Sequence, residues 1–131
     1  MILLDTHALI WWVSGSPSLS GRARRAIERA RRSTGMAVSA ISFLELATIV
    51  RRGRLDLGLP LAEWLREVGQ IAELRVEPVT AEIAQTAGSL GDAYPGDPVD
   101  RVIAATAINL QLRLVTADQR LRAAPRLRTL W

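Results

Sequence analysis

The sequence predicts an α/β fold in which helices cover both faces of a parallel sheet. Short apolar runs typical of strands alternate along the chain with segments whose apolar residues recur at helical spacing. Such alternation indicates strand–helix–strand units, which form parallel sheets. No internal repeat, low-complexity tract or linker interrupts the 131 residues, so we expect a single domain spanning residues 1–131.

The first half of the chain supplies two strands and four helices. Residues 1–4 are a continuous apolar run, and the amphipathic segment 19–32 sets Leu19, Ala23 and Ile27 opposite several arginines. A glycine at position 53 ends one helix, and a proline at position 60 opens the next. The expected elements are strand 1–4, helix 6–13, helix 19–32, strand 36–39, helix 42–52 and helix 60–68.

The second half continues the alternation. Residues 74–78 alternate apolar and charged side chains as a strand does, and residues 98–112 begin with a proline in the first turn of a helix. The expected elements are strand 74–78, helix 80–90, helix 98–112, strand 113–116, a short helix over 118–122 and a tail at 129–130. Ligands of such folds bind outside the carboxyl ends of the strands, so residues there are the first candidates for function.

Composition excludes several classes of protein. The chain contains no cysteine, which rules out a disulfide scaffold, a zinc–thiolate site and a cysteine nucleophile. Its start has no basic region and meets Asp5 too early for a signal peptide, and no apolar run approaches the ~18 residues of a membrane span. We therefore expect a cytoplasmic protein. The net charge is +4, and every basic residue is an arginine. Arginine binds phosphate well and so suits a nucleic-acid partner, although a GC-rich gene would also encode arginine in place of lysine.

Two carboxylates stand out in the first half. Asp5 ends the first strand and could simply cap the helix that starts at Thr6. Glu45 is the only charged residue between positions 40 and 50, so we expect its helix to be largely buried and the carboxylate to need a partner or a metal. A capping box formed by Ser42 and Glu45 is an equally good explanation.

Three more acids lie at later strand-to-helix junctions. Asp97 has the position of a helix N-cap, Asp100 follows in the first turn, and Asp118 comes after the strand that ends at Thr116. Each acid has a local explanation as a cap, but in a parallel sheet all these junctions meet at one edge. Carboxylates that converge there repel one another, and a hard divalent cation relieves the repulsion. With no cysteine and only one histidine, Mg²⁺ or Mn²⁺ fits better than zinc, and carboxylate-bound Mg²⁺ is suited to phosphodiester hydrolysis.

Four motifs, in order along essentially the whole chain, resemble those of one nuclease family. They are Asp5-Thr6-His7, the stretch Ser39-Ala40-Ile41-Ser42-Phe43-Leu44-Glu45-Leu46, the stretch from Asp97-Pro98-Val99-Asp100 to Ala107, and Leu114-Val115-Thr116-Ala117-Asp118. Together they resemble the PIN-domain nucleases, specifically VapC-type toxins of bacterial toxin–antitoxin systems. The resemblance implies a three-layer α/β/α fold with a small, mostly parallel sheet. It also implies a Mg²⁺-dependent endoribonuclease, homodimeric and silenced by a cognate antitoxin.

Carried over position by position, the resemblance makes Asp5, Glu45, Asp100 and Asp118 the catalytic metal ligands. Asp100 takes the third place because it directly precedes the apolar helix, which leaves Asp97 as an accessory acid or cap. We expect the Thr116 hydroxyl to orient Asp5 or a metal-bound water. Arg101 is the best-placed arginine for a substrate phosphate or for pairing with Asp97.

Other conspicuous side chains favour structural roles. His7 could meet a phosphate, but a packing or capping role is favoured over catalysis. Trp11 and Trp12 are expected to pack in the core or a dimer face, with base stacking the less favoured interpretation. The arginines at 22, 25, 29 and 32 either follow RNA phosphates or form a solvated helix face.

Competing functions fit the residues less well. A phosphoacceptor receiver domain normally needs a lysine, which the chain lacks, and an aspartyl phosphatase would have Asp-x-Asp where Asp5-Thr6-His7 stands. A non-catalytic binding module of the same fold and a nuclease acting on DNA remain open, because the preference for RNA comes from the resemblance alone.

Overall fold

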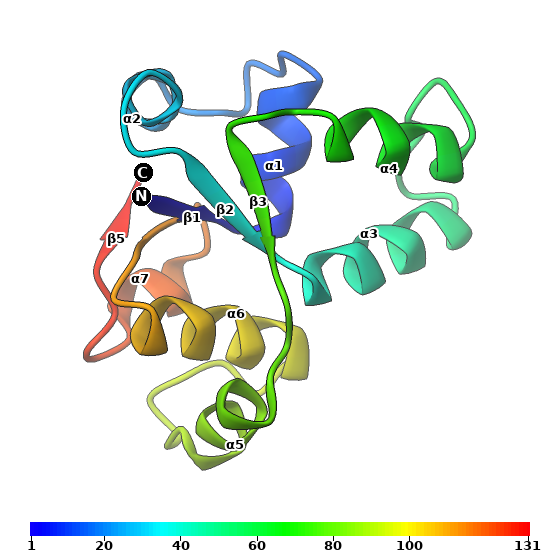
Figure 1. Ribbon diagram of the computed structural model, residues 1–131. Coiled ribbons are helices and arrows are strands. Elements are labelled where there is room, and N and C mark those ends of the chain that lie inside the picture. The colour runs from blue at the N-terminus through cyan, green and yellow to red at the C-terminus, as the bar shows by residue number, and fades with distance from the viewer.

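A computed structural model describes residues 1–131 and shows five strands alternating with seven helices (Figure 1). In chain order the elements are β1 (Ile2–Leu4), α1 (Thr6–Val13), α2 (Gly21–Arg31), β2 (Met36–Ser39), α3 (Ile41–Arg51), α4 (Leu61–Gly69), β3 (Leu74–Glu77), α5 (Ala81–Ser89), α6 (Pro98–Asn109), β4 (Arg113–Val115), α7 (Gln119–Ala123) and β5 (Thr129–Leu130). The predicted alternation is confirmed, with boundaries shifted by a few residues.

The strands form one sheet in the order β3-β2-β1-β4-β5, and every neighbouring pair is parallel. The expectation of a tail at the C-terminus is wrong, because Thr129–Leu130 pairs with β4 as a fifth strand. The amide of Thr116 donates to the carbonyl of Leu130 at 3.1 Å, which fixes this edge. A two-residue strand carries too little pattern to be recognised in the sequence.

Helices cover both faces of the sheet, as the fold class predicts (Figure 1). Successive strand residues point to opposite faces, so Leu4 and Val38 pack in one apolar core with residues of α1, α2 and α4. Leu3, Ala37 and Leu114 pack in the other core with residues of α6 and α7. Helix α5 packs against α6 as an outer element. The arrangement is the three-layer α/β/α sandwich, with β1 buried on both faces.

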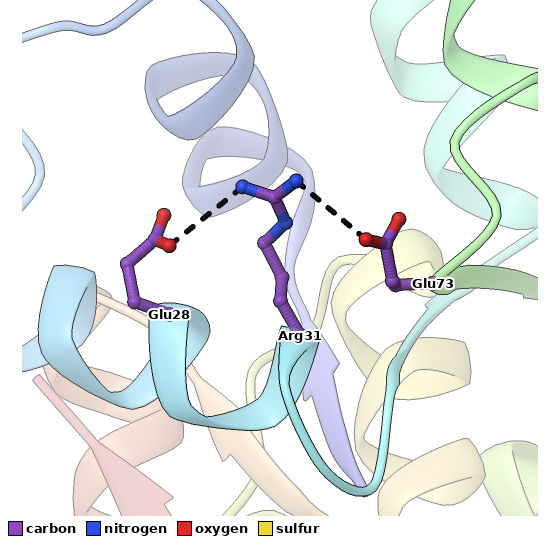
Figure 2. A network of polar contacts seen from close by, with 3 residues as sticks. All are labelled: Glu28, Arg31 and Glu73. Carbon is purple, nitrogen blue, oxygen red and sulfur yellow. Dashed lines mark ion pairs between the residues drawn. The ribbon is translucent and has the colours of Figure 1, made fainter.

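Helix α2 is amphipathic in the predicted sense. Its alanines and Ile27 are buried, whereas the arginines at positions 22, 25, 29 and 32 are exposed. At its C-terminal end Arg31 lies between two carboxylates, 3.6 Å from Glu28 and 3.6 Å from Glu73, and over the ring of Trp12 (Figure 2). These ion pairs are partly exposed and contribute little energy each, but they tie α2 to the turn that precedes β3.

Helix α3 corrects an expectation. We expected it to be largely buried, yet only Ser42 and Leu46 are buried and Leu44 is 58% exposed. The helix projects beyond the carboxyl ends of the strands and packs chiefly on α6 and α1, so much of its surface lies outside the two cores (Figure 1). Its Leu44 and Ile49 therefore line a surface groove, whereas Leu46 lies in the core and Phe43 and Val50 pack against it. No helix in the chain is long and apolar enough to cross a membrane.

Candidate active site

The four predicted ligand acids line one cavity at the carboxyl edge of the sheet. Asp5 follows β1, Glu45 lies in the second turn of α3, Asp100 in the first turn of α6, and Asp118 follows β4. The cavity has a volume of about 350 Å³. Its lining consists of Asp5, Thr6, His7, Trp11, Glu45, Asp100, Ile103, Ala117 and Asp118. The parallel sheet thus brings together side chains that are more than a hundred residues apart in sequence.

Asp5 is the most buried of the four acids, with 8% of its surface exposed. Its carboxylate accepts a hydrogen bond from the amide of Ala8 at 2.8 Å and so caps α1, as the structural explanation predicted. Burial raises the pKa of Asp5, and hydrogen bonds from the Thr116 hydroxyl and the Ala8 amide oppose that rise. The residue is therefore a cap and also a desolvated carboxylate facing the cavity.

Asp100 is the acid whose ionisation is most disfavoured. Burial raises the pKa of Asp100 to about 7, and the carboxylates of Asp97, Asp118, Glu45 and Asp5 add to the rise in that order. All four neighbours act on it because all four are close. This coupling is the electrostatic signature of the predicted cluster.

Asp118 and Asp97 are helix caps. Asp118 is exposed and accepts hydrogen bonds from the amides of Arg120 and Leu121, at 2.8 and 3.0 Å. Asp97 accepts from the amide of Val99 at 2.8 Å and lines a neighbouring groove rather than the acidic cavity. Asp118 therefore belongs to the cavity and Asp97 to its border.

Glu45 is not part of a capping box. The N-cap residue of α3 is Ala40, which has no side chain to cap the helix, and the Ser39 hydroxyl accepts from the amide of Ile41 at 3.3 Å. Ser42 is buried inside the helix and its hydroxyl has no hydrogen-bond partner. Glu45 is thus left to the cavity, which removes one of the two explanations that the sequence left open.

Arg101 corrects a further expectation. Its guanidinium donates to the backbone carbonyls of Ala87, Pro95 and Leu90, which belong to α5 and the loop that leads to α6. It forms no ion pair with Asp97. These three hydrogen bonds make Arg101 an anchor of this loop.

Two cavity residues were misjudged or overlooked from the sequence. His7 was expected to pack or cap, but it is exposed at the rim of the cavity, with its ring 5.4 Å from that of Trp11. Thr6 was given no role, yet it lines the cavity and its buried hydroxyl has no partner. The position of both in the first turn of α1, directly after Asp5, was the available signal.

The residues present fit a hard divalent cation. The donors are carboxylate oxygens with one imidazole at the rim, two of the carboxylates are hard to ionise without a compensating charge, and the Thr6 hydroxyl lacks a partner. In the arrangement seen, no three of these side chains are already gathered around one point as ligands. Asp5, Glu45, Asp100 and Asp118 are the residues that would hold such an ion.

The chain is thus a parallel three-layer α/β/α domain with carboxylates gathered at the carboxyl ends of its strands. The PIN domain family matches residues 2–127, and the chain belongs to this family. The chain is 42% identical to Ribonuclease VapC22 of Mycobacterium tuberculosis over 132 residues, which covers 99% of this chain and 98% of that protein.

Solved structures agree on the fold. The chain is similar to the VapBC2 complex of Rickettsia felis, bound to a DNA fragment from its promoter, with a TM-score of 0.74, 20% identity and coverage of 99% of this chain and 98% of that one. It is also similar to Mycobacterium tuberculosis VapC20, a sarcin–ricin loop cleaving toxin, with a TM-score of 0.67, 19% identity and coverage of 98% and 99%. At these identities the likeness supports the fold alone.

Proposed function

We propose that the protein is a metal-dependent endoribonuclease and the toxin of a toxin–antitoxin pair. The main support is that one cavity is lined by four acids, Asp5, Glu45, Asp100 and Asp118. Burial and these acidic neighbours raise the pKa of Asp100 to about 7. The choice of RNA as substrate is supported by the 42% identity to a protein named as a ribonuclease.

The four acids would hold Mg²⁺ or Mn²⁺, and a cation there would activate water and stabilise charge on the phosphate. Asp5 would ligate the ion directly, because hydrogen bonds donated by the Ala8 amide and the Thr116 hydroxyl fix the orientation of its carboxylate. The Thr116 hydroxyl donates to Asp5 and accepts from the backbone amide of Asp118 at 3.1 Å. Thr116 therefore links the Asp5 side chain to the backbone of Asp118. Asp97 remains an accessory acid at the border.

The proposal includes two protein partners. A cognate antitoxin would silence the enzyme by covering the acidic cavity, which suits an arginine fork because carboxylates accept it in bidentate pairs. The solved structures similar to this chain include a toxin–antitoxin complex from Klebsiella pneumoniae, which supports an antitoxin partner. A second copy of the chain is expected to complete a homodimer.

The test is cleavage of total RNA by the purified chain in Mg²⁺, in Mn²⁺ and in excess chelator, followed on gels. We expect discrete fragments with either metal and intact RNA in chelator. Asp5→Asn and Asp100→Asn should remove cleavage, whereas Asp92→Asn, which changes an exposed acid outside the cavity, should retain it. Equal cleavage with metal and with chelator would reject the metal mechanism.

The same assay addresses the alternatives. Cleavage of a matched single-stranded DNA with no cleavage of RNA would favour the DNA nuclease. Absence of cleavage of either nucleic acid, with normal metal binding, would favour a non-catalytic binding module.

A further inference from the structure

A second groove leads away from the acidic cavity along α3. It has a volume of about 560 Å³ and is lined by His7, Leu44, Glu45, Thr48, Ile49, Arg52, Arg54, Asp97 and Val99. His7 and Glu45 line both the groove and the acidic cavity, so the two spaces meet at these residues. The groove therefore opens directly onto the proposed cleavage site.

One stripe of α3 forms a wall of this groove. Glu45, Thr48, Ile49 and Arg52 are spaced three and four residues apart, which places them on one face of the helix. From Glu45 to Arg52 the helix rises by about 10 Å. The wall thus runs from a carboxylate at the cavity to a guanidinium at the far end.

The arginines at the far end are not engaged elsewhere. Arg52 and Arg54 are exposed, and neither forms an ion pair with a carboxylate of the chain. Between these arginines and Glu45 the lining includes the apolar side chains of Leu44, Ile49 and Val99, together with Thr48 and the carboxylate of Asp97. The groove therefore offers two cations without ion pairs beyond a partly apolar floor, next to a site suited to a scissile phosphate.

We propose that this groove holds the RNA strand on one side of the cleaved bond, with Arg52 and Arg54 binding a backbone phosphate beyond the scissile one. The inference rests on the proposed ribonuclease function. It follows from where the charges lie along the groove. The acidic cavity can accept a phosphate only together with a metal cation, whereas Arg52 and Arg54 at the other end of the groove can bind a phosphate directly. Arginine forks bind phosphate oxygens in bidentate pairs, and the apolar floor can contact a ribose or base.

A salt titration measures this contact. A labelled single-stranded RNA of mixed sequence would be titrated in Mg²⁺, by fluorescence anisotropy, onto protein carrying Asp100→Asn to prevent cleavage. For single strands, the slope of log affinity against log salt changes by about 0.7 for each phosphate contact. Arg52→Gln with Arg54→Gln should lower the slope by roughly 0.7 to 1.4 and weaken binding.

The matched control removes the same charge elsewhere. Arg122→Gln with Arg126→Gln changes two exposed arginines near the C-terminus, which line neither the acidic cavity nor the groove. This pair should leave the slope nearly unchanged. An equal fall in slope for both pairs would show a general charge effect and overturn the assignment of the groove.

Cleavage kinetics of the otherwise unmodified protein supply a second readout. The substrates would be short RNAs, with and without extra nucleotides on one side of the cleaved bond. The variant with Arg52→Gln and Arg54→Gln should have a KM several-fold higher than wild type and a similar kcat. Its KM should no longer fall when the RNA is extended. Melting temperatures would confirm that the variants fold, and Arg52→Glu would enlarge the effect if glutamine proves too mild.

The outcomes separate the two proposals. A wild type that cleaves no RNA in Mg²⁺ refutes the proposed function itself. A wild type that cleaves RNA, with groove variants that bind and cleave normally, refutes only the groove. Variants that bind RNA normally but escape an antitoxin also refute it, because the groove would then be a protein-binding surface.

Discussion

Asp97 accepts a hydrogen bond from the backbone amide of Asp100 at 3.3 Å, while the Asp100 carboxylate accepts none within the chain. The two acids of the Asp-Pro-Val-Asp motif therefore divide two tasks. Asp97 caps α6 by accepting hydrogen bonds from its first free amides. The Asp100 side chain faces the cavity instead, where burial and neighbouring carboxylates raise its pKa to about 7. This division favours Asp100 over Asp97 as the metal ligand.

Substituting each acid separately should reveal this division. In chelator, Asp97→Ala should lower the free energy of unfolding by up to about 1 kcal/mol, because α6 loses its cap. Asp100→Asn should leave it unchanged or raise it, because it removes a like charge. Urea denaturation at pH 8 measures both. Equal destabilisation by the two variants would make Asp100 a structural residue as well.

The stability of the metal-free protein should depend on pH through Asp100. This group ionises near 3.9 in the unfolded chain but only near 7 in the folded one. Between those values the folded protein holds a proton that the unfolded chain has lost, so the free energy of unfolding falls as pH rises from about 4 to about 7. The raised pKa of Asp5 acts in the same direction.

The Asp100→Asn protein should lack most of that dependence. Its stability relative to wild type should therefore increase between pH 5 and pH 8 in chelator, as followed by denaturant midpoints. Asp92→Asn serves as the control for a general change in charge. A stability difference between Asp100→Asn and wild type that stays constant over this range would contradict the coupling of the acids.

Two buried threonines test how Asp5 is held. Thr116 donates its hydroxyl toward Asp5, whereas Thr106 in α6 donates to the carbonyl of Val102 and does not line the cavity. Thr116→Val should cost about 1 kcal/mol and weaken Mg²⁺ binding, because the Asp5 carboxylate loses a donor. Thr106→Val should cost less and leave Mg²⁺ binding unchanged. Calorimetric titration with Mg²⁺ compares them, and equal metal affinity in both variants would remove Thr116 from the site.

Arg101 should behave as a structural anchor. Arg101→Gln leaves at least two of the carbonyls of Ala87, Pro95 and Leu90 without their donor, so we expect a loss of roughly 2 kcal/mol in stability. The salt dependence of RNA binding should stay as in wild type, because no phosphate contact is lost. A fall of about 0.7 in that slope would restore Arg101 as a phosphate ligand.

The fold and the set of acids in the cavity could be predicted because both follow from local patterns. Alternating strands and helices dictate a parallel sheet, and a parallel sheet gathers its strand ends, so Asp5, Glu45, Asp100 and Asp118 had to lie near one another. The same geometry lets Asp5 and Asp118 cap helices and face the cavity at once. For these two acids the capping explanation and the metal-site explanation were therefore compatible, whereas for Glu45 the capping box is wrong.

The contacts that were missed depend on which side of an element faces its neighbours. The sequence does not show that α3 projects past the sheet, so its apolar residues suggested burial. Arg101 lies beside Asp100 in the sequence, yet its side chain reaches back to carbonyls of α5 and the following loop, a direction set by tertiary packing. His7 was assigned to packing because nothing local shows that its turn borders an open cavity.

Metal binding by the acidic cavity is the central claim, and the shift of melting temperature on adding Mg²⁺ tests it most directly. A ligand that binds only the folded state stabilises it by about 2.7 kcal/mol at one hundred times its dissociation constant. Wild type and Asp92→Asn should therefore melt several degrees higher in excess Mg²⁺ than in chelator at pH 8, and Asp100→Asn should gain much less. A wild type that gains nothing, or an Asp100→Asn protein that gains as much as wild type, would contradict the account.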